Sequence, residues 1–91
     1  CIIVGGGIGG CAIGALLAHD GWKVKLFDKN KIIGGRCTTY DHEGYKIDLG
    51  VHLFGEGNSG FLGDVLRAVG EPDAIKWVLS KDPRPILILL N

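Results

Sequence analysis

The sequence has no methionine, no long apolar run and no excess of charge of either sign. Its longest apolar run, 86–90, has five residues, which is too short to cross a bilayer as a helix. Ten Lys and Arg balance ten Asp and Glu without a basic stripe, so we expect no nucleic-acid partner. Because the chain opens inside a strand-like run and is shorter than a typical domain of about 100–200 residues, we expect a piece of a longer protein.

Several catalytic and metal-binding arrangements are also absent. The three Cys and three His form neither a CxxC nor an HxxxH spacing, so we expect no metal site. No Ser–His–Asp arrangement, carboxylate pair or Walker lysine stands out, and no residue can be named as a catalytic acid or base. The three separated cysteines indicate free thiols in a reducing compartment. We therefore expect a cytoplasmic protein that is at most peripheral to a membrane.

Glycine, by contrast, is abundant, and six residues between 5 and 10 form the most informative motif. An apolar strand, 1–4, leads into Gly5, Gly7 and Gly10, which satisfy the pattern G-x-G-x-x-G. In this pattern the glycines allow a tight turn, the approach of a pyrophosphate and close packing of a helix on the sheet. The unpaired N–H groups and the dipole of the following helix favour phosphate binding. The expected phosphate cradle comprises Gly5, Gly6, Gly7, Ile8, Gly9 and Gly10.

The next elements complete a strand–helix–strand unit. Residues 8–19 are apolar on most sides, which is typical of a buried helix, and Asp20-Gly21 would end it. A second strand, 23–27, is followed by Asp28, eighteen residues after Gly10 and near the spacing of about 20 expected for an acid that binds ribose hydroxyls. Such a carboxylate disfavours the 2′-phosphate of NADP. The alternative interpretation is a glycine-rich turn in an ordinary α/β domain.

A second glycine pair, Gly34-Gly35, is followed directly by Arg36. The glycines allow the backbone to approach a ligand, and the arginine offers a planar, charged fork suited to phosphate oxygens. From residue types alone, an ordinary turn with a solvated arginine explains this segment equally well. An NAD domain would normally continue with another crossover helix, so the early Gly-Gly-Arg argues against a nicotinamide dehydrogenase.

The remainder of the chain predicts a β-hairpin, a helix and further strands. Strands at 37–41 and 45–49 would be joined by the turn 42–44. Asn58 or Ser59 would cap a helix over 60–69. A strand at 74–80, a turn at 82–85 and a strand at 86–90 would follow, with Phe61 and Trp77 in the core and Cys11 and Cys37 buried. The predicted fold class is α/β, with a Rossmann-like βαβ dinucleotide-binding unit, then a β-hairpin, a helix and the start of a second β region.

Four segments together resemble the N-terminus of the FAD-dependent phytoene desaturase and amine oxidase superfamily: 5–10, Asp28, 34–36 and 48–54. The likeness is closest to the phytoene desaturase-like branch of carotenoid desaturases and isomerases. Residues 48–52 match its Asp-x-Gly-x-His motif, and Gly60-Phe61-Leu62 resembles the start of the helix that follows.

The resemblance implies FAD as cofactor. The first glycine loop would hold the pyrophosphate, and Asp28, where the family more often has Glu, would hold the adenosine ribose. Gly35 and Arg36 would contact the phosphates and the ribityl chain, and the loop 48–52 would pass near the isoalloxazine ring. His52 would then lie close to the flavin, although a loop histidine bonded to backbone explains it as well. The candidate cofactor-binding residues are Gly5, Gly6, Gly7, Ile8, Gly9, Gly10, Asp28, Lys29, Gly34, Gly35, Arg36, Gly50 and His52.

The resemblance also implies a flavin that accepts a hydride from a C–C bond of an apolar, polyene-like small molecule, reached by peripheral membrane contact. Three alternatives stay open: an amine oxidase acting on a C–N bond, an NAD-binding dehydrogenase, and a non-enzymatic relative such as the Rab GDP-dissociation inhibitors. We expect residues 1–91 to form part of an N-terminal FAD-binding domain. Residues 1–58 would be its nucleotide-binding core, and 59–91 would lead into a substrate region. Residues 1–91 alone are expected to be inactive.

Overall fold

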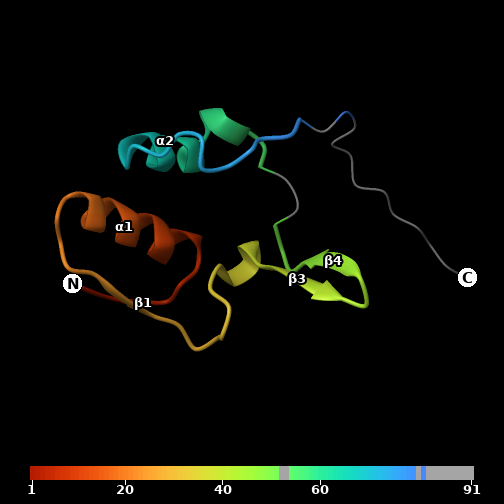
Figure 1. Ribbon diagram of the computed structural model, residues 1–91, viewed down its shortest axis with the longest axis horizontal. Helices are drawn as coiled ribbons and strands as arrows, with labels where there is room; N and C mark the ends of the chain where they lie inside the picture. Colours follow the sequence, from red (N-terminus) through yellow and green to blue (C-terminus); the bar gives the residue numbers. More distant parts are fainter. Residues whose placement is uncertain (52–53, 80, 82–91) are drawn as a thin grey trace, which may run out of the picture.

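The computed structural model describes residues 1–51, 54–79 and 81 (Figure 1). Its first part is a βαβ unit made of β1 (Ile2–Val4), α1 (Ile8–His19) and β2 (Lys25–Phe27). The two strands pair in parallel, with Ile3 opposite Leu26, and α1 contacts both of them. The predicted Rossmann-like unit and the α/β class are confirmed.

The helix α1 has the bounds that its apolar pattern predicts. It lies close to the sheet because Gly14 has no side chain: a Cβ there would come 3.1 Å from Cδ1 of Ile3. The helix ends as expected at Gly21, whose φ of +92° is in the left-handed region. The N–H of Gly21 donates to the carbonyl of Ala18, and that of Trp22 donates to the carbonyl of Leu17, both at 3.0 Å. This is a Schellman motif.

The expectation that α1 is buried is wrong for the structure described. None of its residues is buried, and Ile8 and Ile13 are 45% and 48% exposed. The expectation that Cys11 and Cys37 are buried is also wrong, because both are half-buried. The elements that contact α1, namely β1, β2 and α2, are short and leave part of its apolar surface uncovered.

The predicted hairpin is present as β3 (Thr39–His42) and β4 (Tyr45–Asp48), paired antiparallel with Tyr40 opposite Ile47. Its two turn residues, Glu43 and Gly44, have φ of +49° and +83°, as a type I′ turn requires. Cys37 belongs to a 3₁₀ turn, η1 (Gly35–Cys37), and not to the strand. The strands are therefore shorter than predicted.

The second helix, α2 (Phe61–Ala68), follows a 3₁₀ turn, η2 (Gly57–Ser59), and contacts α1 (Figure 1). The expectation that Asn58 or Ser59 caps it is wrong, because the N-cap residue is Gly60 and no side chain caps the helix. The backbone carbonyl and the side-chain oxygen of Asn58 instead accept hydrogen bonds from Arg67 at 2.9 and 3.3 Å. Phe61 is not a core residue: it is 87% exposed, at the edge of a groove between α1 and α2.

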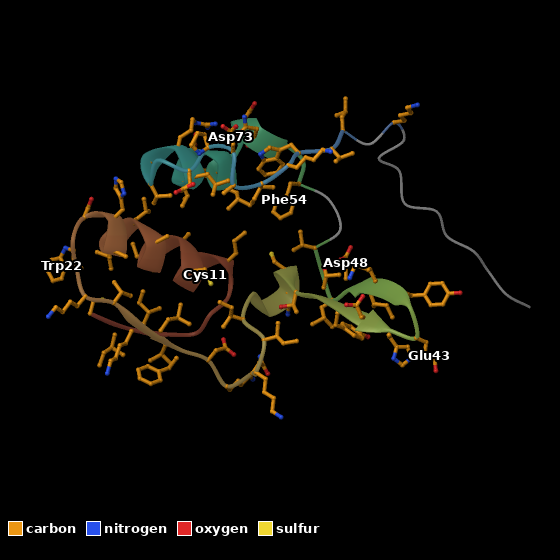
Figure 2. All side chains as sticks on the ribbon, in the orientation of Figure 1. Cys11, Trp22, Glu43, Asp48, Phe54 and Asp73 are labelled. Carbon is orange, nitrogen blue, oxygen red and sulfur yellow. The ribbon has the colours of Figure 1, made fainter. Side chains whose placement is uncertain are left out.

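Residues 74–79 form a bend and an irregular segment, so the predicted strand is wrong over this range. Val78 and Leu79 are exposed, and no described strand pairs with the segment. Trp77 is half-buried against Phe54, with ring centroids 5.9 Å apart in an edge-on arrangement. Figure 2 labels Phe54. The turn predicted at 82–85 and the strand predicted at 86–90 lie outside the described residues. Within the described ranges, no helix has the length and apolar character needed to cross a membrane.

Candidate dinucleotide-binding site

The loop between β1 and α1 is fixed by two of its glycines. Gly5 has a φ of +103°, a conformation that side-chain-bearing residues rarely adopt, and its N–H donates to the carbonyl of Phe27 at 2.7 Å. A Cβ at Gly10 would lie 1.9 Å from the carbonyl oxygen of Gly5, a distance that no relaxed structure accommodates. The first and third glycines of the motif are therefore required by the fold itself.

Gly7 is different, because nothing in the described fold requires it to be glycine. Its φ of −73° suits any residue, and a Cβ there would meet no atom within 4 Å. The same open space surrounds Gly9. This space lies at the N-terminus of α1, where an approaching ligand would meet bare backbone.

The first turn of α1 presents free hydrogen-bond donors to that space. The N–H of Cys11 donates to the carbonyl of Gly7 at 2.9 Å. The N–H of Ile8 faces the carbonyl of Gly34 in the parallel bridge between Gly7 and Gly34, whereas the N–H groups of Gly9 and Gly10 have no backbone acceptor among the residues that the structure describes. No acidic side chain lies in this turn. Unpaired N–H groups and the positive end of the helix dipole together favour an anion such as a phosphate.

Asp28 follows β2 directly and lies beside this loop, and both of its carboxylate oxygens accept hydrogen bonds. Oδ2 accepts the N–H of Gly6 at 2.7 Å, and Oδ1 accepts the N–H of Asn30 at 2.7 Å. The hydrogen bond from Asn30 and then that from Gly6 hold the pKa of Asp28 below its ordinary value, so the group is charged at neutral pH. A carboxylate offers about four acceptor positions, so this one retains capacity for further hydroxyl donors.

The second glycine pair lies against the first glycine loop. The N–H of Gly34 donates to the carbonyl of Gly6 at 2.6 Å, and Gly34 forms a parallel bridge with Gly7. A Cβ at Gly35 would be 3.2 Å from Cα of Gly7. Arg36 follows directly; it is exposed and makes no hydrogen bond or ion pair through its side chain to any described residue. The first glycine loop, 5–10, and the segment 34–36 thus lie side by side although they are well separated in the sequence.

Gly50 is brought next to Arg36. A Cβ at Gly50 would lie 2.9 Å from Cβ of Arg36, and the N–H of Val51 donates to the Arg36 carbonyl at 3.0 Å. The structure therefore joins the loop that carries Gly50 to the second glycine pair. His52 lies outside the described residues.

Lys29 follows Asp28 and is exposed. With Val4, Gly5, Phe27 and Asp28 it lines a surface pocket of about 450 Å³. In the described ranges of the chain, no group of three or more His, Cys, Asp or Glu could hold a metal ion.

Two residues that support the loop are not predicted from the sequence. Asn30 donates to Asp28, and the i, i+2 spacing of an Asx turn was the signal that could have revealed it. Cys11 donates from Sγ to the carbonyl of Gly6 at 3.4 Å, and no pattern in the sequence points to that contact. Cys11 thus contacts the loop directly, and Asn30 acts on it through Asp28.

The sequence of the chain matches a protein family and several known proteins. A family profile described as an NAD(P)-binding Rossmann-like domain matches residues 3–69. All-trans-retinol 13,14-reductase of Macaca fascicularis is 30% identical over 88 residues, covering 97% of this chain and 14% of the reductase. Phytoene desaturase of Cercospora nicotianae is 44% identical over 52 residues, covering 57% of this chain and 8% of the desaturase. The chain thus spans about a seventh or less of the length of these relatives.

A solved structure agrees with the fold. The crystal structure of the PF1083 protein from Pyrococcus furiosus superposes with a TM-score of 0.69 at 36% identity, covering 76% of this chain and 18% of that one. The relatives named phytoene desaturase confirm the resemblance noted from the sequence. The chain belongs to the family of NAD(P)-binding Rossmann-like domains.

Proposed function

We propose that this chain binds the diphosphate of FAD and serves as the dinucleotide-binding part of a flavin-dependent oxidoreductase. One observation carries the proposal: the open space at Gly7, faced by the unpaired N–H groups of the first turn of α1. The fold leaves this position bare although it could accommodate a side chain. A ligand that needs close approach to the backbone explains why glycine is there.

Each part of the site has a role in this proposal. The unpaired N–H groups of Gly9 and Gly10 would donate to the diphosphate oxygens, and Arg36 would add a charged fork from the opposite segment. Asp28 would accept hydrogen bonds from the adenosine ribose hydroxyls with its remaining acceptor positions. Its negative charge would also disfavour a 2′-phosphate in the same place.

Two observations support FAD over a nicotinamide dinucleotide. The second glycine pair with Arg36 lies against Gly7, which adds a second wall to the phosphate site. Relatives over this region are named phytoene desaturase and all-trans-retinol 13,14-reductase. A second candidate function is the binding of NAD(P). It is favoured by the description of the family profile as an NAD(P)-binding domain.

The proposed reaction is a two-electron oxidation or reduction at a C–C bond of an apolar, polyene-like small molecule. Phytoene and retinol, named in the relatives, are molecules of that kind. When bound, FAD supplies the two-electron chemistry. The residues of this chain would bind and orient it; no described side chain is assigned as an acid or base.

The proposal can be tested with Gly7→Val in the intact protein, using Gly55→Val as the matched control. A Cβ at Gly55 also meets no atom within 4 Å, and Gly55 lies outside the proposed site. We expect Gly7→Val to weaken FAD binding by about 100-fold because the side chain blocks several backbone contacts, and Gly55→Val to leave it unchanged.

Binding would be measured by titrating the apoprotein with FAD and with NAD and following intrinsic fluorescence. FAD retention by Gly7→Val at the wild-type level would contradict the diphosphate site. Binding of NAD without binding of FAD would favour the second candidate.

A further inference from the structure

The backbone of Gly6 is held by hydrogen bonds at both its N–H and its carbonyl. Its N–H donates to Oδ2 of Asp28 at 2.7 Å, across 22 residues of chain. Its carbonyl accepts the N–H of Gly34 at 2.6 Å and the thiol of Cys11 at 3.4 Å. Cys11, labelled in Figure 2, lies at the end of α1 that follows the loop. The middle of the glycine loop is thus anchored to three other segments, and its N–H is directed to Asp28.

Asp28 is itself held in place. Its second oxygen accepts the N–H of Asn30 at 2.7 Å, so the carboxylate cannot turn away from the loop without breaking that contact. Hydrogen bonds from backbone N–H groups to a carboxylate are stronger than those between neutral groups. Gly6 also packs tightly, since a Cβ there would lie 3.0 Å from side-chain atoms of Leu26 and of Ile33. The loop therefore has one defined position relative to β2.

We propose that Asp28 is a positioning residue for the diphosphate loop, in addition to any contact with the ribose. By holding the N–H of Gly6, Asp28 keeps the loop in the conformation that leaves N–H groups at the start of α1 free for an anion. This inference rests on the proposed function, because it gives Asp28 an effect on the binding of the diphosphate as well as on that of the ribose. A ribose-only residue would act on the hydroxyls and on nothing else.

The test compares two ligands in Asp28→Asn and in the matched control Asp73→Asn. Asp73 is an exposed carboxylate that follows α2 (Figure 2). The ligands are ADP and 2′,3′-dideoxy-ADP, which has the same diphosphate but neither ribose hydroxyl. Asn is isosteric with Asp but keeps only one acceptor oxygen, so one of the two backbone contacts is lost.

We expect Asp28→Asn in the intact protein to weaken binding of both ligands by about tenfold, as the loss of one hydrogen bond to a charged group implies. The control should change neither. A loss confined to ADP, with dideoxy-ADP bound as well as by the wild type, would overturn the inference.

A second measurement needs no ligand. In the ligand-free intact protein, amide hydrogen exchange at Gly6 should be about tenfold faster in Asp28→Ala, which removes both acceptor oxygens, than in wild type and unchanged in Asp73→Ala. Unchanged exchange at Gly6 would overturn the inference even if FAD binds. Conversely, failure of wild type to bind FAD or ADP would overturn the proposed function while the exchange result still decided the role of Asp28.

If Asp28→Asn does not fold, the wild-type protein still decides the matter. The amide resonances of Gly6 and Asn30 should shift with one common midpoint as acid protonates Asp28, since both donate to that carboxylate. Separate midpoints, or a Gly6 resonance that does not move, would contradict the inference.

Discussion

The starts of α1 and α2 are built on the same backbone plan. Each helix has glycine as its third residue, and each of these glycines lies against a carbonyl five residues earlier. A Cβ at Gly10 would be 1.9 Å from the oxygen of Gly5, and one at Gly63 would be 1.9 Å from the oxygen of Asn58. Each helix also has an extended glycine as its N-cap residue.

The two starts differ in what surrounds that N-cap glycine. A Cβ at Gly7 would meet nothing within 4 Å, whereas one at Gly60 would lie 3.1 Å from Cβ and 3.2 Å from Oε2 of Glu56. The first turn of α2 also carries Asp64, which pairs with Arg67, and α1 has no acid there. Glycine spacing therefore shapes the backbone at both helices, but only the start of α1 is open and free of competing carboxylates.

The largest expected effect tests the shared plan. Gly10→Ala and Gly63→Ala should each destabilise the fold by about 3 kcal/mol. The carbonyl of Gly5 or of Asn58 would have to move by 1 Å or more to make room for the added Cβ, and the loop that contains it would lose its conformation. Urea unfolding of the intact protein measures this loss.

The same two variants also test whether the starts of α1 and α2 differ in ligand binding. Gly10→Ala should also weaken FAD binding by the folded protein, and Gly63→Ala should not. Equal effects on FAD affinity would show that the two helix starts are not functionally distinct.

An intermediate effect is expected from placing an acid in the first turn of α1, as α2 has one in its own first turn. Gly9→Asp has room for its side chain and puts a negative charge in the first turn of α1. It should raise stability by about 0.3–1 kcal/mol through the helix dipole and weaken FAD binding about tenfold by repelling phosphate.

The uncharged variant Gly9→Asn is the control for that change. It has the same shape, so any difference between the two variants measures the charge. Equal affinity for FAD in both variants would mean that the open, acid-free start of α1 does not select for an anion.

The smallest effect concerns the opposite helix ends, which are alike. Gly21 and Gly70 both have positive φ, +92° and +78°, and both end a helix with a Schellman motif. Replacing either with Ala should cost about 1 kcal/mol in thermal unfolding, and Asn should cost less because it tolerates this conformation. Neither variant should change FAD affinity. If Gly21→Ala changes it and Gly70→Ala does not, the C-terminal end of α1 also affects FAD binding, and the two helices differ at both ends.

Elements governed by local chemistry could be predicted from the sequence. The bounds of α1 follow from an apolar run between glycine turns, and the hairpin follows from alternation around Glu43-Gly44. The spacing of Asp28 from the glycine motif also placed it at the loop. In each case the determining interactions lie close together in the chain or follow a fixed period.

Features that depend on distant partners could not be predicted. The alternation at 74–79 resembles a strand, but a strand needs a neighbour, and none of the described strands provides one. Asn58 is a good capping residue by type, yet its oxygens are taken by Arg67 from the far end of α2. The contact between Asp28 and Gly6 is likewise a property of the folded arrangement.

The described residues contain no buried hydrophobic side chain; beyond glycines, Thr38 alone is buried. Residues 1–91 on their own would therefore hydrate less apolar surface on unfolding than a domain with a buried core does. Measured on these residues alone, the heat-capacity increment should fall below the usual value of about 12–15 cal/mol/K per residue. In such a span, cooperativity depends on the polar network that ties the loop, β2 and the second glycine pair together.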